Sequence, residues 1–443
     1  MTTLSIMIVA VFVTGYLCIA LESLTKINKA AIALLMCVLC WTLLMMGPGA
    51  YYPTVEPDGL LHHISEVIEH HLGDAAGTLF FLMGAMTIVE IVDSNGGFNF
   101  VRDTMKTRSK RKLLWRVAFM TFFLSAILDN LTTSIVMIMV LRKLVQQREE
   151  RLIYAGLIIV SANAGGAFSP IGDVTTIMLW IKGVITTQGV ISELLLPSLV
   201  SMIVPAFILQ YSLKGKFDVA QNLQVAEVSQ FTKAQRTAIF WLGVGGLVFV
   251  PIFKTITHLP PFMGILLVLG VLWTVTEIFH YNTSEDDTMA KRVSDLLSRI
   301  DMSTIMFFLG ILMAVAVLQE IGVLTALGEG LNEVFSGNYY LINGIIGVLS
   351  SIVDNVPLVA GCMGMYPVSA EGAMAIDGIF WQLLAYCAGV GGSMLIIGSA
   401  AGVVVMGLEK ITFGWYLKKI TWIAFVGYLA GILCYWVERM ILF

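Results

Sequence analysis

The chain has 443 residues, of which 58% are hydrophobic and 13% are charged, and its formal net charge is −4. Soluble globular proteins carry about a quarter charged residues, so this composition excludes a soluble globular protein and indicates a polytopic membrane protein. The small negative charge gives no reason to expect a nucleic-acid partner. All six cysteines lie in or beside apolar runs, so we expect no disulfide framework.

Basic residues are unevenly distributed along the chain. Lysine and arginine are absent from 30–101, 183–213 and 300–409. They collect instead at 26–29, 102–116, 142–151, 214–236, 291–299 and 410–419. The positive-inside rule places these basic segments in the cytoplasm. The pattern predicts a multi-pass protein of the inner (plasma) membrane, embedded in lipid, with both termini outside.

Apolar runs predict an all-α polytopic membrane protein with about ten spans, two re-entrant hairpins and two discontinuous helices. In the first half we expect spans at 4–21, 30–46, 75–93 and 190–213, a hairpin at 113–141 and a broken span at 152–187. In the second half we expect spans at 237–256, 261–280, 303–321 and 418–437, a hairpin at 341–365 and a broken span at 379–408. The connectors that begin at Pro57 and Tyr281 are expected to form surface helices.

The two halves share polar landmarks. LDN at 128–130 recurs as VDN at 353–355, 225 positions later, and the Gly-Gly pair at 165–166 recurs at 391–392, 226 positions later. Each half has about five full crossings, an odd number, so the second copy would enter the membrane in the opposite orientation. The sequence therefore predicts two inverted repeats, residues 1–236 and 237–443, an architecture common among secondary transporters.

The run LSAILDNLTTSIVM, residues 124–137, places an acid, an amide and hydroxyls in an apolar segment with basic clusters on both sides. This pattern favours a re-entrant hairpin with its polar tip inside the bilayer. An ionisable residue there costs at least about 2.5 to 3.5 kcal/mol, so Asp129 and its equivalent Asp354 are candidate functional groups. The alternative role of both aspartates is to cap a helix, and one aspartate can both cap a helix and take part in function. Further candidates at the two tips are Asn130, Thr132, Thr133 and Asn355.

The broken spans supply further candidates. SANAGGAFSPIGDVTTIMLW, residues 161–180, has glycines, a proline and an aspartate that should unwind the helix near the bilayer middle. Carbonyl, carboxylate and hydroxyl oxygens suit a small hard cation, and no transition-metal ligand spacing is present. One carboxylate can hold a proton or a sodium ion, rarely both, which suffices for exchange. The candidates here are Asn163, Ser169, Asp173 and Ser393, with local backbone bonding as the alternative for Asn163 and Ser169.

Other titratable residues lie near the ends of spans. Glu90 and Glu320 occupy near-equivalent positions and are candidates for a proton relay, with interfacial packing as the alternative. The connector after Pro57 carries four histidines, His62, His63, His70 and His71. A solvated helix face is the expected role of these histidines, and a metal site or a pH sensor are the alternatives.

LDNLTTS, SANAGGAFSPIGD and VDNVPLVAG, in that order and spacing, resemble the NhaD-type sodium/proton antiporters of the ion transporter superfamily, over essentially the whole chain. The resemblance implies paired hairpins and discontinuous helices that move against a scaffold, usually in a homodimer. It also implies export of Na⁺ or Li⁺ against entry of H⁺, and no cofactor is expected. On this chain the site would comprise Thr132 and, as Na⁺ ligands, Asp129, Asn130, Asp173, Asp354 and Asn355.

Three other functions fit parts of the pattern. Related sodium-coupled dicarboxylate symporters carry Ser-Asn-Thr at their tips, whereas both tips here have aspartate at the serine position, whose charge opposes an anionic substrate. The sodium-coupled anion symporter remains the second candidate. An intramembrane aspartyl protease is disfavoured because the Tyr-Asp and Gly-x-Gly-Asp pattern of presenilins is absent, so we do not expect an enzyme. Broken helices in inverted repeats favour alternating access over a passive channel.

Overall fold

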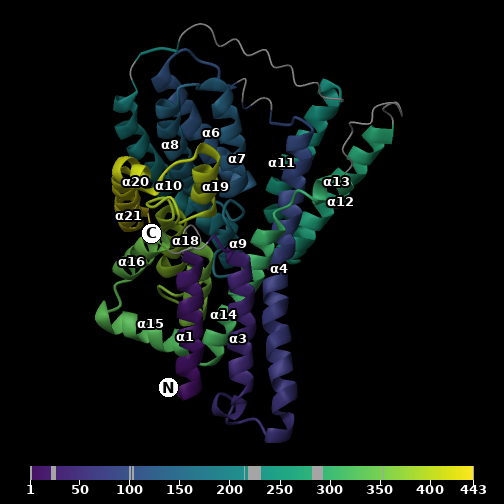
Figure 1. The fold of residues 1–443 in the computed structure, drawn as a ribbon, viewed down its shortest axis with the longest axis vertical. Helices are drawn as coiled ribbons and strands as arrows, with labels where there is room; N and C mark the ends of the chain where they lie inside the picture. The colour runs from purple at the N-terminus through teal and green to yellow at the C-terminus, as the bar shows by residue number, and fades with distance from the viewer. Residues whose placement is uncertain are drawn as a thin grey trace.

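The computed structural model describes residues 2–20, 26–98, 101, 104–213, 215–217, 231–281, 293–352 and 354–442. Within these ranges the chain forms helices joined by loops, together with an isolated backbone bridge between Ser109 and Lys216. Six of the described helices are long and apolar enough to cross a membrane. The predicted class, an all-α polytopic membrane protein, is confirmed (Figure 1).

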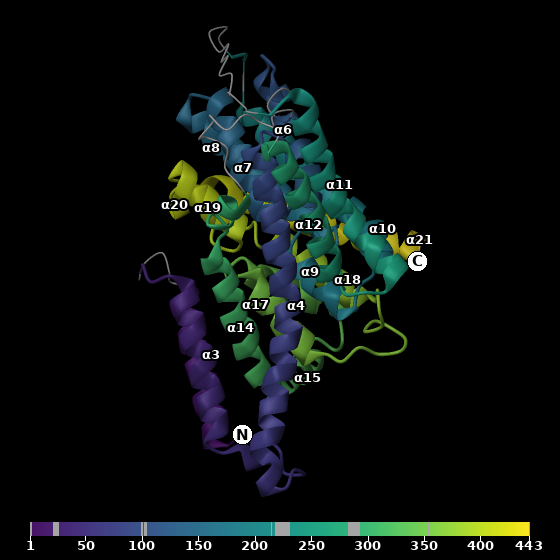
Figure 2. The ribbon, with the colours of Figure 1, turned by 90° about the vertical axis from the view of Figure 1, so that its right-hand side faces the viewer.

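The first helices are α1 (Thr3–Ala20), α3 (Lys29–Met45) and α4 (Leu60–Ser94), with the short turns η1 (Pro48–Ala50) and η2 (Pro57–Gly59) between the last two. The sequence predicted a surface helix after Pro57 and a separate span at 75–93, but α4 is one continuous helix of 35 residues (Figure 2). It is about 52 Å long, well beyond a hydrocarbon core of about 30 Å. The change in polarity near residue 75 contains no proline, so the backbone continues through it.

The remaining helices of the first half are α6 (Lys110–Leu128), α7 (Asn130–Leu144), α8 (Arg148–Ala167), α9 (Val174–Lys182) and α10 (Thr187–Leu209), which η3 (Gln210–Ser212) extends. The single residue Asp129 separates α6 from α7, in the region of the expected hairpin at 113–141. Non-helical backbone at 168–173 separates α8 from α9, in the region of the expected broken span.

The second half contains α11 (Lys233–Thr257), α12 (Pro261–Tyr281), α13 (Val293–Leu297), α14 (Met302–Glu320), α15 (Val323–Val334), α16 (Tyr339–Ser350), α17 (Asn355–Met365), α18 (Ile379–Gly391), α19 (Ala400–Glu409), α20 (Phe413–Tyr416), η4 (Leu417–Thr421) and α21 (Trp422–Leu442). Non-helical backbone at 392–399 again separates a pair of helices, α18 and α19. The sequence did not predict α15, which is amphipathic and only 12 residues long. The expected surface helix after Tyr281 falls partly on 282–292, outside the described residues.

Glycine allows the same close contact in each half. A Cβ on Gly165 of α8 would collide with the backbone carbonyl of Phe122 on α6. A Cβ on Gly391 of α18 would collide with the backbone carbonyl of Gly347 on α16. Backbone atoms cannot swing aside as a flexible side chain can, so both positions require glycine. The glycine pairs thus bring each tip-bearing helix directly against a broken helix.

Gly391→Ala should therefore weaken the contact between α16 and α18. Overpacking of this kind costs about 1 to 3 kcal/mol, and the thermal midpoint of the detergent-purified protein should fall by several degrees. Gly407→Ala is the matched control, because nothing lies within 4 Å of a Cβ at that glycine. Equal midpoints for the two variants would contradict the packing argument.

The helices pack in two groups. The outer group is α1, α3, α4, α11, α12 and α14, in which α1 packs on α3, α3 on α14, α14 on α4, and α4 on α11 and α12. The site group is α6 to α10, α16 to α19 and α21, which pack around the two breaks. In Figure 1, α4, α11 and α12 lie on the right, and α6, α7, α8 and α10 lie at the upper left. Contacts of α14 with α17 and of α4 with α9 join the two groups.

Candidate cation site

Asp129 forms the first tip. Its φ of 77° and ψ of 161° are unusual for a residue with a side chain. The carboxylate accepts hydrogen bonds from Thr132 N at 2.8 Å and from Thr132 Oγ1 at 2.9 Å, which caps α7. The predicted capping role is therefore present. Strained backbone of this kind costs about 1 to 3 kcal/mol and concentrates at functional sites, which favours a second role for Asp129.

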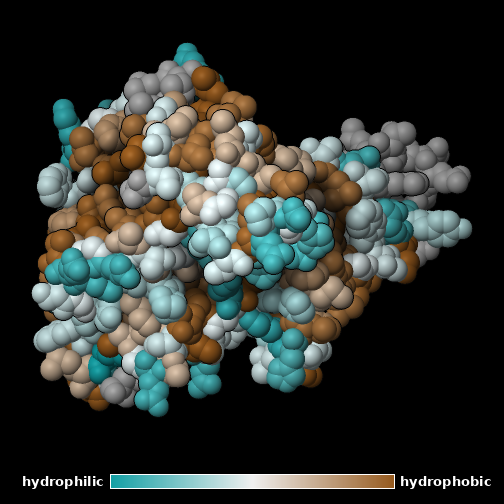
Figure 3. Space-filling view, turned by 90° about the horizontal axis from the view of Figure 1, so that it is seen from below, coloured by the Kyte–Doolittle hydropathy of each residue, from teal (hydrophilic) through white to brown (hydrophobic). Residues whose placement is uncertain are grey.

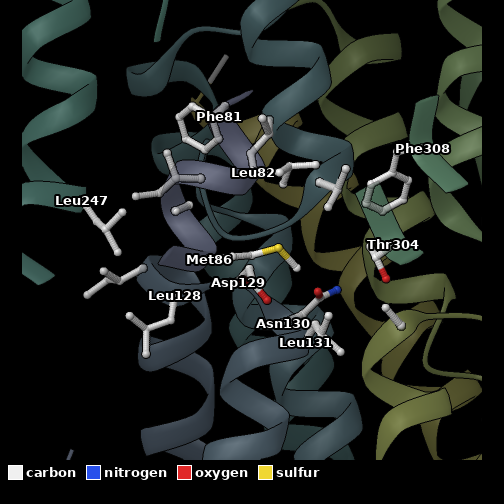
Figure 4. A pocket seen from close by; sticks show the side chains of 16 residues that line it. Phe81, Leu82, Met86, Leu128, Asp129, Asn130, Leu131, Leu247, Thr304 and Phe308 are labelled. Carbon is white, nitrogen blue, oxygen red and sulfur yellow. The ribbon is translucent and has the colours of Figure 1, made fainter. Parts of the chain in front are cut away.

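A small cavity of about 40 Å³ lies beside Asp129. Its walls come from both groups and are mainly apolar, with Phe81, Leu82 and Phe308 on the outer-group side. Figure 4 shows Met86 directly beside Asp129. A water molecule needs roughly 10 to 15 Å³ by this measure, so the cavity has room for a small ion or a few water molecules. Asp129 thus contributes the carboxylate of a small space between the outer group and the site group.

Asp173 is the centre of a hydrogen-bond network that both tips reach. It is 1% exposed and caps α9, where its Oδ1 accepts from Thr175 N at 3.0 Å. Asn130 of the first tip donates from Nδ2 to Asp173 Oδ2 at 2.8 Å. Asn355 of the second tip places its Nδ2 3.3 Å from each Asp173 oxygen. One buried carboxylate therefore holds the amides of two tips.

Asn163 extends this network to the second break. Its Oδ1 accepts from Asn130 Nδ2 at 3.1 Å, and its Nδ2 donates to Ser399 Oγ at 2.9 Å. Ser399 caps α19 by accepting from Gly402 N at 3.2 Å. Ser399 stands 226 positions after Asp173, which is the offset of the Gly-Gly pairs. The network joins both tips and both broken helices, with aspartate in one break and serine in the other.

The other candidate hydroxyls fall into two classes. Thr133 Oγ1 is buried and has no hydrogen-bond partner within the described part of the chain. Ser169 Oγ donates to the Ala126 carbonyl at 2.5 Å, and Ser393 Oγ donates to the Val390 carbonyl at 2.6 Å. Both serine hydroxyls are thus bound to backbone carbonyls, and for Ser169 this is the alternative role that the sequence left open. Thr133 is thus the candidate hydroxyl whose oxygen makes no backbone or side-chain bond within the described residues.

Asp354 forms the second tip. One carboxylate oxygen accepts from Val356 N at 3.4 Å and caps α17. The other oxygen lies 2.9 Å from Lys29 Nζ. The sequence prediction used Lys29 only as a marker of the cytoplasmic side and missed this ion pair. The available signal was a lysine immediately before a long apolar run, at the first position of α3.

Glu90 and Glu320 make ion pairs outside the Asp173 network. Arg299 donates to Glu90 at 3.1 Å. Glu320 accepts from Tyr52 OH at 2.7 Å and pairs with His71 Nε2 at 2.8 Å. Burial, followed by the hydrogen bond to Glu320, raises the pKa of Tyr52, so this hydroxyl stays a donor. Glu320 thereby joins α14 to α4, and Glu90 joins α4 to the segment between α13 and α14.

Glu320 and His71 line a larger cavity, of about 1010 Å³, between α4, α9, α11, α12, α14 and α17. Its other titratable lining residues are His63, Glu66, His70, Asp74, Lys182, Lys254 and His258. The side chains of His62 and His70 are 80% and 75% exposed, as a solvated helix face requires. In the view from below, hydrophilic side chains cluster near the middle of the face that is shown (Figure 3).

A family model described as Citrate transporter matches residues 16–385, which include both tips and Asp173. Sodium/proton antiporter 1 of Arabidopsis thaliana is 46% identical over 427 residues, or 96% of this chain and 71% of that protein. Sodium/proton antiporter 2 of the same plant is 42% identical over 426 residues, or 96% and 97% of the two chains. Na(+)/H(+) antiporter NhaD of Alkalimonas amylolytica is 31% identical over 461 residues, or 96% and 88%.

Proposed function

Because the chain belongs to the family that the Citrate transporter model and the NhaD sodium/proton antiporters define, we propose that it exchanges cytoplasmic Na⁺ or Li⁺ for external H⁺. Each of these relatives is named as a transporter, which agrees with the expectation that the chain is not an enzyme. The observation that carries the proposal is the convergence of Asn130 and Asn355 on the buried carboxylate of Asp173.

The charge of the site favours a cation as substrate. Asp129, Asp173 and Asp354 bring three carboxylates to the two tips and the first break, and Lys29 pairs with one of them. A site with an excess of carboxylates repels citrate, which is itself a multiply charged carboxylate. The name of the family model therefore gives the second candidate, sodium-coupled anion symport, and the charge argues against it.

The Asp173 network contains the oxygen ligands that a small hard cation requires. The Asn130 and Asn355 amides donate to Asp173, and half a turn about the last side-chain bond would present their oxygens to a cation. Asp173 would supply the charged ligand of Na⁺, and Asp129 a second carboxylate at the neighbouring cavity. The first tip, the first break and the second tip would therefore close around one ion.

Exchange follows from competition for these carboxylates. A proton on Asp173 removes the charge that holds Na⁺, and loss of the proton restores it. In the proposed cycle the site group moves against the outer group only when Asp173 carries a proton or a cation. Movement with an unneutralised carboxylate is unfavourable, because it would bury an unpaired charge in the apolar interior. The carboxylate that a proton or a cation must neutralise in turn is thus on the moving group itself.

The membrane potential can drive this exchange. Each net charge that crosses gains about 2.3 kcal/mol per 100 mV, so more than one proton per Na⁺ would allow the potential to expel sodium. Asp129 and Asp173 leave room for two protons.

We further propose that the two halves, 1–236 and 237–443, are inverted repeats with both tips inside the bilayer. The basic segments would then lie on the cytoplasmic side of an inner membrane, and both termini on its outer side. We expect two such chains to form a homodimer.

The direct test is proton movement in everted membrane vesicles that contain the protein. A pH-sensitive dye reports dequenching when NaCl, LiCl, KCl or sodium citrate is added to respiring vesicles. We expect dequenching with Na⁺ and Li⁺, none with K⁺, and no uptake of labelled citrate. Vesicles without the protein give the background. Sodium-dependent citrate uptake without dequenching by NaCl would replace antiport with the symporter alternative.

A further inference from the structure

A lysine side chain lies at the second tip, where the proposed function requires a cation to bind. Lys29 Nζ is 2.9 Å from Asp354 Oδ2 and 4.2 Å from the centre of the Phe307 ring. Both side chains of the ion pair are largely buried, with 21% and 14% exposed. Asp354 is followed directly by Asn355, whose amide reaches Asp173. An ammonium group therefore stands one residue away from the Asp173 network.

The ion pair connects the two groups of helices. Lys29 begins α3 of the outer group, and the adjacent Asn28 donates to Ser303 Oγ of α14 at 2.8 Å. Phe307, under the ammonium, also lies on α14. Asp354 caps α17 of the site group. The ammonium is thus held by the outer group, whereas its carboxylate belongs to the group that carries the candidate cation site.

The two tips differ in how their carboxylates are satisfied. Asp129 accepts two hydrogen bonds from Thr132 and borders a small cavity. In contrast, one carboxylate oxygen of Asp354 pairs with Lys29, which is 325 positions away in the sequence. A helix cap needs no such partner, as Asp129 shows. The lysine therefore has a role beyond that of completing the cap.

We propose that Lys29 is a tethered cation that competes with the transported cation for Asp354. This inference rests on the proposed function. The ammonium and Na⁺ carry the same charge, so one carboxylate satisfies one of them fully at a time. Cation binding at the second tip would displace Lys29 and release the site group from α3, and departure of the cation would let the pair form again. Lys29 would thereby lower the affinity for Na⁺ and link release of Asp354 to movement between the two groups.

Substitutions of Lys29 should change the Na⁺ requirement in opposite directions. A site that is free only a tenth of the time binds about tenfold more weakly, so Lys29→Met should lower the KM for Na⁺ by up to about tenfold. Lys29→Arg should raise the KM, because a guanidinium binds a carboxylate through two hydrogen bonds. In an Asp354→Asn background, Lys29→Met should leave the KM unchanged. KM and maximal rate are measured by dye dequenching against NaCl concentration in everted vesicles.

A second readout does not depend on transport. The NaCl concentration that half-maximally raises the thermal midpoint of detergent-purified protein should fall in Lys29→Met and rise in Lys29→Arg. Ser303→Ala is the matched control, since it removes a neighbouring contact between α3 and α14 and leaves Asp354 untouched. A purely structural ion pair would lower the thermal midpoint in Lys29→Met and leave the half-maximal Na⁺ concentration of both lysine variants at the wild-type value, and that result would overturn the inference.

The two proposals can fail separately. If the wild-type protein shows no Na⁺-dependent dequenching, the proposed function fails and the inference fails with it. If the wild type exchanges Na⁺ for H⁺ but both lysine variants keep its KM, the inference alone fails. Should Lys29→Met not accumulate as folded protein, Lys29→Arg decides, because a KM at or below the wild-type value contradicts competition.

Discussion

Asp173→Asn is expected to abolish Na⁺-dependent proton exchange in everted vesicles. The asparagine is nearly isosteric and can still accept the Thr175 N hydrogen bond that caps α9, so the break should keep its shape. It cannot bind a proton as a carboxylate does, and it carries no charge for Na⁺. Loss of one partner in a buried charged interaction costs about 2 to 5 kcal/mol, so initial rates should fall at least about thirtyfold.

Thermal midpoints separate this loss from misfolding. Asp173→Asn should keep a midpoint near that of the wild type but lose the rise in midpoint that NaCl produces. Asp74→Asn is a suitable control, because Asp74 is 52% exposed and lies on α4 away from the tips. Exchange at the wild-type rate in Asp173→Asn would show that the central carboxylate binds neither ion.

Asp129→Asn is expected to reduce exchange nearly as strongly. Asparagine has nearly the same shape as aspartate and also caps helices, so this change removes the charge with little disturbance of the first tip. The cavity beside residue 129 would lose its carboxylate, and the KM for Na⁺ should rise about tenfold or more, the equivalent of at least about 1.4 kcal/mol. Dequenching rates over a range of NaCl concentrations measure the change.

The chain offers a matched control for this substitution. Asp301 caps α14 in the same way, accepting from Thr304 N at 3.1 Å and from Thr304 Oγ1 at 2.5 Å, but it is exposed. Asp301→Asn therefore makes the same chemical change in the same type of cap, at a carboxylate that does not itself line the cavity. If the two variants have equal KM values for Na⁺, the role of Asp129 is limited to capping.

Most helix positions could be predicted because each apolar run must span a bilayer. Two of the differences between the predicted and the observed helices have clear physical causes. The predicted boundary inside α4 was a change in polarity, which a helix with no proline passes without interruption. Helix α15, with Glu329 and Glu333 on a short amphipathic segment, lacks the continuous apolar surface on which the span prediction relied. Hydrophobicity therefore located the membrane-crossing helices better than the helices that run beyond or between them.

The candidate site was predictable in its residue types and less so in its contacts. Aspartates and asparagines inside apolar runs are conspicuous, so Asn130, Asp173 and Asn355 could be named from the sequence. Their convergence depends on how two halves of the chain pack, as does the bond from Asn163 to Ser399 across 236 positions. The pairing of Lys29 with Asp354 depends on the same packing, and a lysine beside an apolar run is as typical of a membrane boundary as of an ion pair.

The sharing of Asp173 between the two tips has a consequence for biosynthesis. Asn130 precedes Asp173, but Asn355 follows it by 182 positions. At roughly 5 to 20 residues per second, the ribosome needs about 10 to 35 s to reach the second asparagine. During that interval the newly inserted first half has Asn130 available to its buried acid but not the amide of the second tip. Completion of the second half therefore completes the hydrogen bonding of the first, and neither half can assemble the whole site while the other is still unmade.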